Sequence, residues 1–359
     1  MRTLLVTGGA GFIGGNYVLR SLANDSQLRI VNLDVLTYAG NLDTLAPLRD
    51  DKRHVFVKGD IGNADLVSSL FQEYRPAGVV SFAAESHVDR SIDGPADFIQ
   101  TNIVGTFNLL QCAKEWWKTR PEDEQQSFRF LHVSTDEVYG SLGDTGLFEE
   151  TTAYAPNSPY AASKASSDHL VRAYHHTFGL PTLTTNCSNN YGPYQFPEKL
   201  IPLIVLNALE LKPLPVYGDG RQVRDWLYVL DHVDAINTVL EKGIPGEVYN
   251  VGGNSERTNM QVVEAICDIV DQRRPDASFG SRRGLVEHVA DRPGHDRRYA
   301  IDSAKMREEI GWKPEKTFES ALEAKIRWYV ENQLWCDDVR SGQYTEFFDT
   351  WYGDRLSAS

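Results

Sequence analysis

Two adjacent carboxylates follow a strand-like segment near the middle of the chain. The apolar run at residues 128–133 is typical of a buried strand, and Thr135, Asp136 and Glu137 come next in STDEVYG. Ligands of doubly wound parallel sheets bind at the carboxyl ends of the strands. Neighbouring carboxyl groups can act as an acid and a base when their environments keep one protonated and one ionised. We therefore interpret Asp136 and Glu137 as an acid–base pair, the alternative being a solvated turn.

A tyrosine and a lysine with catalytic spacing stand further along the chain. Ser158 and Pro159 are typical of a helix start, and the helix is expected to run to about Phe178. Tyr160 and Lys164 are four residues apart, so they share one face of this helix. A lysine ammonium beside a phenol lowers the tyrosine pKa and makes it a base near neutral pH. Two unrelated surface residues can show the same spacing.

A glycine-rich turn near the N-terminus indicates a dinucleotide site. Gly8, Gly11 and Gly14 in GGAGFIG follow an apolar strand and open a helix at about Phe12. Small residues let the backbone approach a pyrophosphate, which binds at the helix N-terminus. A plain strand-to-helix turn is the alternative.

Acidic residues after the next two strands strengthen that prediction. Asp34 closes the second strand, where a carboxylate binds a ribose hydroxyl and repels a 2′-phosphate, so NAD is favoured over NADP. Asp60 and Ile61 follow the third strand and are placed to border the adenine.

The elements that position these residues alternate between strand-like and helix-like segments. Strands are expected at 3–7, 29–33, 54–57, 79–82, 128–133 and 182–185, and helices from 12, at 65–74, 95–116, 158–178 and 318–334. The rhythm predicts an α/β fold: a doubly wound parallel sheet of Rossmann type with a smaller C-terminal α/β substrate-binding lobe over its carboxyl edge. The charged run at 119–127 is expected to be a surface loop. We expect an NAD-binding domain at 1–188, a lobe at 189–340 with some segments returning to the first domain, and a tail at 341–359.

Composition excludes several other classes of protein. The net charge of −14 opposes general nucleic-acid binding, and no apolar run is long enough to span a membrane. The N-terminal segment lacks the pattern of a signal peptide, so a cytoplasmic protein is expected. Four separated cysteines without a CxxC pair predict neither a zinc site nor disulfides, and His175 with His176 lacks partners at ligand spacing. We predict no metal.

Several motifs together carry a resemblance to a known family. They are STDEVYG, AAESHVDRS at 83–91, NCSNNYGPYQFPEKLIP at 186–202 and DRPGHDRRY at 291–299. With the glycine turn and the YxxxK spacing, they make the chain similar to the extended short-chain dehydrogenases/reductases and, among them, to the dTDP-glucose 4,6-dehydratase family. The resemblance covers nearly the whole chain, except residues 116–127 and those after about 340.

The resemblance implies an NAD-dependent lyase acting on dTDP-glucose. Tyr160, with Thr135 and Lys164, would take the proton of the sugar 4-hydroxyl as C4 is oxidised. The C4 ketone acidifies the hydrogen on C5, so Glu137 would act as base at C5 and Asp136 as acid at the C6 hydroxyl, before hydride returns to C6.

The resemblance also implies the binding residues and a homodimer. The NAD site would comprise Gly8, Gly11, Phe12, Ile13, Gly14, Asp34, Leu36, Thr37, Asp60, Ile61, Phe82, Ala83, Ala84, Ser86, Thr101, Tyr160 and Lys164. The sugar-nucleotide site would comprise Ser86, Thr135, Asn189, Asn190, Lys199, Leu200, Pro215, Tyr217, Arg224, Asn259, Arg292, His295 and Tyr299. The helices at 95–116 and 158–178 would pair with a second copy.

Three alternatives stay open on the sequence alone. A sugar-nucleotide 4-epimerase uses the same Tyr160 and Lys164 but needs no acid–base pair after Thr135. A dehydratase could act on another nucleotide sugar, because the nucleotide base rests on the resemblance. A non-catalytic NAD-sensing scaffold would have no reason to keep the five catalytic residue types together.

Overall fold

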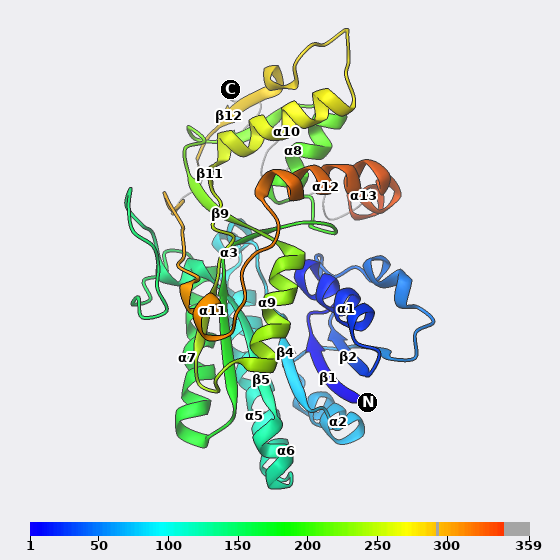
Figure 1. The fold of residues 1–359 in the computed structure, drawn as a ribbon, viewed down its shortest axis with the longest axis vertical. Coiled ribbons are helices and arrows are strands. Elements are labelled where there is room, and N and C mark those ends of the chain that lie inside the picture. The colour runs from blue at the N-terminus through cyan, green and yellow to red at the C-terminus, as the bar shows by residue number, and fades with distance from the viewer. Residues whose placement is uncertain (292–293, 341–359) are drawn as a thin grey trace.

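A seven-stranded sheet organises the larger part of this computed structural model, which describes residues 1–291 and 294–340 (Figure 1). Its strands are β1 (Arg2–Thr7), β2 (Leu28–Asp34), β3 (His54–Lys58), β4 (Gly78–Ser81), β5 (Arg129–Thr135), β6 (Thr182–Cys187) and β10 (Val248–Val251). They lie in the order β10-β6-β5-β4-β1-β2-β3, and every pairing is parallel. The chain winds outwards in opposite directions from β1 and β4, so a topological switch point lies between them. The predicted doubly wound sheet is confirmed.

Helices cover both faces of this sheet because its strands are apolar on both sides. In β1, Leu4 and Val6 face one layer and Leu5 faces the other. The first layer contains α1 (Phe12–Asn24) and α9 (Val229–Lys242), and the second contains α2 (Ala64–Tyr74), α5 (Thr106–Lys118) and α7 (Pro159–Phe178). Alternate residues of each central strand are therefore buried in separate cores.

The boundaries of α7 follow the sequence signals closely. The Ser158 side chain accepts a hydrogen bond from the Ala161 N–H at 3.1 Å, and Pro159 occupies the first turn. Gly179, with a φ of 76°, ends the helix in the left-handed region. The predicted start and end of this helix are both confirmed.

Two other predicted elements differ in detail. The segment expected as one helix at 95–116 consists of α4 (Pro95–Phe98), a π-helical segment η2 (Ile99–Gly105) and α5. The prediction of a surface loop at 119–127 is wrong in part, because Glu122–Ser127 forms helix α6. Three acidic residues in its first turn favour a helix N-terminus, while none of its side chains is buried, which removes the apolar periodicity.

A smaller lobe with its own core lies over the carboxyl ends of the strands (Figure 1). Its helices are α8 (Leu200–Leu209), α10 (Asn259–Arg273), α12 (Phe318–Glu331) and α13 (Gln333–Val339). Its strands are β7 (Asn189–Tyr191), β8 (Leu214–Tyr217), β9 (Val223–Tyr228), β11 (Glu256–Thr258) and β12 (Val286–Val289). The helix predicted at 318–334 is interrupted at Asn332.

The chain crosses between the two parts more than once. Strand β10 joins the edge of the large sheet, with α11 (Ala304–Glu309) beside it. Helix α9 packs on α1, where Arg20 contacts Asp234 through two hydrogen bonds of 2.6 and 2.5 Å. The remaining short elements are α3 (Val88–Asp93), η1 (Leu42–Leu48), η3 (Asp136–Tyr139) and η4 (Arg282–Leu285). Among the described helices, none is long and apolar enough to cross a membrane. The predicted tail at 341–359 lies outside the described residues.

Candidate active site

The STDEVYG motif forms a tight turn at the carboxyl end of β5. Thr135 is the last residue of the strand and caps η3, its hydroxyl accepting a hydrogen bond from the Glu137 N–H at 3.3 Å. The same hydroxyl lies 3.4 Å from Oδ1 of Asp136. Gly140, with a φ of 89°, ends η3 in the left-handed region. This geometry places Asp136 and Glu137 in the wall of a cavity.

Asp136 is held in its neutral form by burial. Its side chain is 2% exposed, and its Oδ2 has no hydrogen-bond partner within the described residues. Burial raises the pKa of Asp136 well above its usual value, and the charges of Glu137 and Asp225 raise it further. Arg224 and the Thr135 hydroxyl oppose this rise without cancelling it. Burial therefore favours the protonated form of Asp136, from which it can donate a proton.

Glu137 stands where two cavities adjoin. The first cavity, of about 380 Å³, runs along the ends of β1, β2, β4 and β5, and the second, of about 160 Å³, extends into the smaller lobe. Glu137 borders both, together with Asn189, Asn190 and Lys199. Its negative charge raises the pKa of Asp136 and of Tyr160. The arrangement thus places a carboxylate base beside a carboxylic acid.

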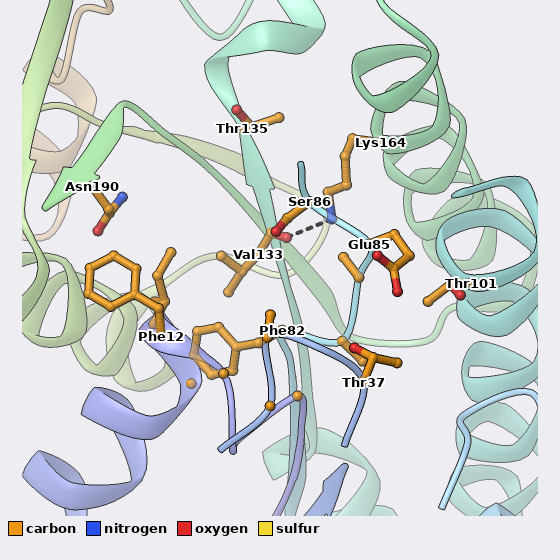
Figure 2. Close-up of a pocket in the computed structure, with 18 of the residues that line it drawn as sticks. Phe12, Thr37, Phe82, Glu85, Ser86, Thr101, Val133, Thr135, Lys164 and Asn190 are labelled. Atoms are coloured by element: carbon orange, nitrogen blue, oxygen red, sulfur yellow. Dashed lines mark hydrogen bonds between the residues drawn. The ribbon is translucent and has the colours of Figure 1, made fainter. Parts of the chain in front are cut away.

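Tyr160 and Lys164 face the first cavity from α7. Burial raises the pKa of Tyr160 well above 10, the charge of Glu137 raises it further, and a hydrogen bond with Thr135 lowers it. The predicted net lowering of the Tyr160 pKa is therefore not found among the protein groups, because burial removes the phenolate from water. Lys164 instead donates a hydrogen bond of 2.9 Å to the main-chain oxygen of Val133 (Figure 2).

The glycine turn at the other end of the first cavity is packed against the end of β4. Gly8 has a φ of 73°, and a Cβ there would lie 2.6 Å from the backbone nitrogen of Ala83. Gly11 caps α1 without a side-chain hydrogen bond, which leaves the first N–H groups of this helix free to bind an anion. The turn therefore has the close backbone approach that a bound pyrophosphate requires.

Asp34 adds an acceptor further along the same cavity. Its carboxylate accepts hydrogen bonds from the N–H groups of Ala10 and Leu36, at 2.9 and 2.8 Å, and keeps lone pairs for ribose hydroxyls. The N-terminus of α1, the Asp34 carboxylate and the face of α7 that carries Tyr160 all border this one cavity. The lining of the cavity therefore fits a bound dinucleotide.

The structure brings most of the predicted site residues to these two cavities. The first is lined by Gly8, Gly11, Phe12, Ile13, Gly14, Asp34, Thr37, Asp60, Ile61, Phe82, Ala83, Ala84, Ser86, Thr101, Thr135, Asp136, Glu137, Tyr160 and Lys164. The second is lined by Asn189, Asn190, Lys199, Leu200, Pro215, Tyr217, Arg224, Asn259 and His295. Figure 2 shows Phe12, Phe82 and Thr101 around the first cavity, with Asn190 at one side.

Two predicted residues are not part of either lining, and a third cannot be placed. Leu36, with a φ of 58°, turns the chain after Asp34 and does not line the first cavity. Tyr299 lies behind the second cavity, with its ring 4.3 Å from the guanidinium carbon of Arg224. Arg292 lies outside the described residues.

The site also contains residues that the sequence interpretation missed. Gln195 and Glu198 border both cavities, and Gln195 donates a hydrogen bond to the main-chain oxygen of Asn190 at 2.9 Å. Burial raises the pKa of Glu198 to about 7. Both residues belong to NCSNNYGPYQFPEKLIP, so their place in this motif could have identified them as site residues. Within 1–291 and 294–340, no cluster of three or more His, Cys, Asp or Glu residues is placed to hold a metal.

Comparison with known proteins identifies the family of this site. The family model for GDP-mannose 4,6 dehydratase matches residues 5–324. The chain belongs to this family.

Individual relatives are similar along nearly their whole length. A dTDP-glucose 4,6-dehydratase of Xanthomonas campestris pv. campestris is 62% identical, over 96% of this chain and 97% of that protein. The crystal structure of dTDP-glucose 4,6-dehydratase from Bacillus anthracis in complex with NAD is 47% identical, with a TM-score of 0.84, and the match covers 94% of this chain and 100% of that one. The structure of a Streptomyces venezuelae dTDP-glucose 4,6-dehydratase with NAD and TYD bound is 46% identical, with a TM-score of 0.86 and coverage of 94% and 99%. These relatives confirm the resemblance drawn from the motifs.

The buried state of Asp136 predicts a spectroscopic signature. We expect infrared difference spectra at pH 7 to contain the carbonyl band of a protonated carboxyl group that is absent in Asp136→Asn, because burial opposes ionisation of Asp136. Asp43→Asn, which removes an exposed carboxylate, should leave that band unchanged. An identical protonated-carboxyl band in wild type and Asp136→Asn would contradict the assignment.

Proposed function

We propose that the chain catalyses the NAD-dependent dehydration of dTDP-glucose to dTDP-4-keto-6-deoxyglucose. The observation that carries this proposal is the deeply buried Asp136, whose ionisation burial opposes, next to Glu137, at the point where the first cavity meets the second. The names of the relatives, and the NAD and TYD bound in the Streptomyces venezuelae structure, support the same reaction and the same nucleotide sugar.

The first cavity would hold NAD. The N-terminus of α1 and the glycine turn would bind the pyrophosphate, and the Asp34 carboxylate would bind a ribose hydroxyl. When bound, NAD supplies a cationic ring that accepts hydride from C4 of the sugar and returns it to C6.

Oxidation at C4 needs a base for the 4-hydroxyl proton. Tyr160 and Thr135 both line the cavity, and the Thr135 side chain lowers the pKa of Tyr160, so both can bind the same sugar oxygen. Because burial and Glu137 raise the pKa of Tyr160, its phenolate requires nearby positive charge. We assign Tyr160 as the base at this oxygen, Thr135 as its hydrogen-bonding partner, and Lys164 as a source of that charge.

Elimination of water needs a base and an acid at neighbouring carbons. A ketone at C4 acidifies the C5 hydrogen, which Glu137 would remove, while Asp136 would protonate the C6 hydroxyl so that it leaves as water. The C5–H and C6–O bonds break, and a C5–C6 double bond forms. A proton then returns to C5 when C6 receives hydride, so the net change is the loss of one water.

The second cavity would hold the rest of the substrate. Lys199, Arg224 and His295 line it and provide donors for a diphosphate, while Pro215 and Tyr217 would lie beside the base. We propose accordingly that residues 1–188 form the NAD domain and that 189–340 mainly bind the nucleotide. Cytoplasmic residence, expected from the sequence, stays a prediction.

A panel of sugar nucleotides tests the reaction and its substrate. With dTDP-, UDP-, GDP- and CDP-glucose offered separately, we expect only dTDP-glucose to give a product lighter by one water. Mass spectrometry of the products is the measurement. Loss of water from another member of the panel would change the assigned substrate, and a product of unchanged mass with inverted C4 would instead establish a 4-epimerase.

Replacing the proposed C5 base separates the two halves of the reaction. Glu137→Gln keeps the size of the side chain and removes its basicity. We expect it to abolish uptake of solvent deuterium at C5 and to slow dehydration by about 10²–10⁴-fold, the usual contribution of a general base. The measurement is mass spectrometry or NMR of sugar recovered from deuterated buffer. Undiminished deuterium uptake at C5 would show that another group is the base.

We also propose a homodimer through the face formed by η2, α5 and α7. Helix α5 packs beside α7, and this layer exposes the apolar side chains Ile99, Val104, Phe107 and Phe178. We expect Phe107→Glu to convert a species of twice the chain mass into monomer, measured by light scattering after gel filtration. Leu334→Glu, at a leucine that is 82% exposed on α13, is the matched control and should leave the mass unchanged. A monomeric wild type would refute the proposal.

A further inference from the structure

Helix α7 places a third polar residue in line with the catalytic pair. Tyr160, Lys164 and Asp168 follow one another at intervals of one helical turn, so they lie on one face. Asp168 is 4% exposed and lines neither cavity. Burying a carboxylate is costly unless it is paired, so its place in the interior needs a physical cause.

The contacts of Asp168 lead directly to Lys164. Its Oδ2 accepts hydrogen bonds from the hydroxyls of Ser134 at 2.8 Å and Tyr154 at 3.1 Å. Its Oδ1 lies 3.4 Å from Nε2 of His132, and that nitrogen lies 3.2 Å from Nζ of Lys164. Nε2 of His132 therefore lies between the carboxylate and the ammonium group, and Oδ1 of Asp168 has no hydrogen-bond partner within the described residues.

The other titratable groups around this cluster are neutral. Burial, followed by the charge of Lys164, lowers the pKa of His132 to about 4, and burial raises the pKa of Cys187 to about 12. Burial also raises the pKa values of the surrounding tyrosines, which are Tyr139, Tyr154 and Tyr160. Two further carboxyl groups face this surrounding: Glu137 and Asp136 both act on Tyr160, and Asp136 also acts on Cys187.

Lys164 therefore depends on one deeply buried partner for its charge. Its side chain is 4% exposed, and burial lowers its pKa, whereas Asp168 and, to a smaller extent, Cys187 raise it. The two groups that Nζ of Lys164 contacts directly, Nε2 of His132 and the main-chain oxygen of Val133, are uncharged. An isolated ammonium group in this place would release its proton far more easily than one in water.

We propose that Asp168 is a positioning residue of this site: its carboxylate is the buried counter-charge of Lys164. Ser134 and Tyr154 hold the carboxylate, His132 separates it from the ammonium group, and Lys164 keeps its positive charge beside Tyr160. Asp168 touches neither substrate nor cofactor and acts through Lys164. Its effect on the reaction rests on the proposed function, whereas the charge pair itself does not.

A stability cycle tests the pair without any substrate. The variants are Lys164→Met, Asp168→Asn and the double variant, compared by melting temperature. Each single change leaves an unpaired buried charge. We therefore expect the double variant to lose much less melting temperature than the sum of the losses in the two single variants. Additive decrements would overturn the proposal. If Asp168→Asn alone does not fold, a folded double variant supports the pair, and failure of both to fold overturns it.

The pH profile of dehydration then tests the effect on catalysis. Asp168→Asn lowers the pKa of Lys164 further, so the alkaline limb of kcat should move to lower pH by about one to three units, the usual effect of one close charge. Asp168→Glu, which restores the charge, should move the limb back towards the wild-type position. An Asp168→Asn profile identical to that of wild type would overturn the catalytic part of the proposal.

A buried aspartate elsewhere supplies the matched control. Asp231 on α9 is 5% exposed, and its carboxylate accepts hydrogen bonds from the N–H groups of Glu315 and Lys316. Asp231→Asn should lower the melting temperature without moving the pH profile. If wild-type protein does not dehydrate dTDP-glucose, the proposed function fails, and the stability cycle still decides whether Asp168 pairs with Lys164.

Discussion

The burial of one carboxyl group beside another is the interaction on which this site depends. Asp136 and Glu137 are neighbours in sequence, yet the first is 2% exposed and borders the first cavity alone, while the second borders both cavities. Burial makes ionisation of Asp136 unfavourable, and the charge of Glu137 and that of Asp225 reinforce this effect. One pair of chemically similar side chains thereby provides an acid and a base at the same pH.

The sheet topology determines what this pair can reach. Because the strand order reverses between β1 and β4, the first cavity extends from the glycine turn to the end of β5. The smaller lobe covers the same edge and adds the second cavity, and Asn190 and Lys199 border both. A long two-part ligand can therefore place one reactive carbon beside Glu137 while its charged end lies in the lobe.

Polar groups behind the cavity explain how the buried face of α7 can hold the charged side chains of Lys164 and Asp168. Lys164 is surrounded by Val133, His132 and Asp168, and Asp168 is in turn held by two hydroxyl groups. The same helix face packs against β5, so the strand that supplies Thr135 also supplies Ser134 and His132. Any change in the packing of β5 against α7 would consequently alter both the acid–base turn and the charge of the lysine.

Local patterns were sufficient to predict the sheet, the glycine turn, the cap of α7 and the residue types of the site. Each of these features is local in sequence. Gly8 has a positive φ within its own turn, Ser158 accepts a hydrogen bond from the N–H of Ala161 three residues later, and Asp34 is the last residue of its strand. The short helix α6 was missed because its side chains are all solvated and leave no apolar period. Only the tertiary structure decided the burial that raises the pKa values of Asp136 and Tyr160, and the positions of Asp168 and Lys164 on either side of Nε2 of His132. Desolvation and charge depend on groups brought together from β5, β6, α7 and β9, which are distant in sequence, so no local pattern could reveal them.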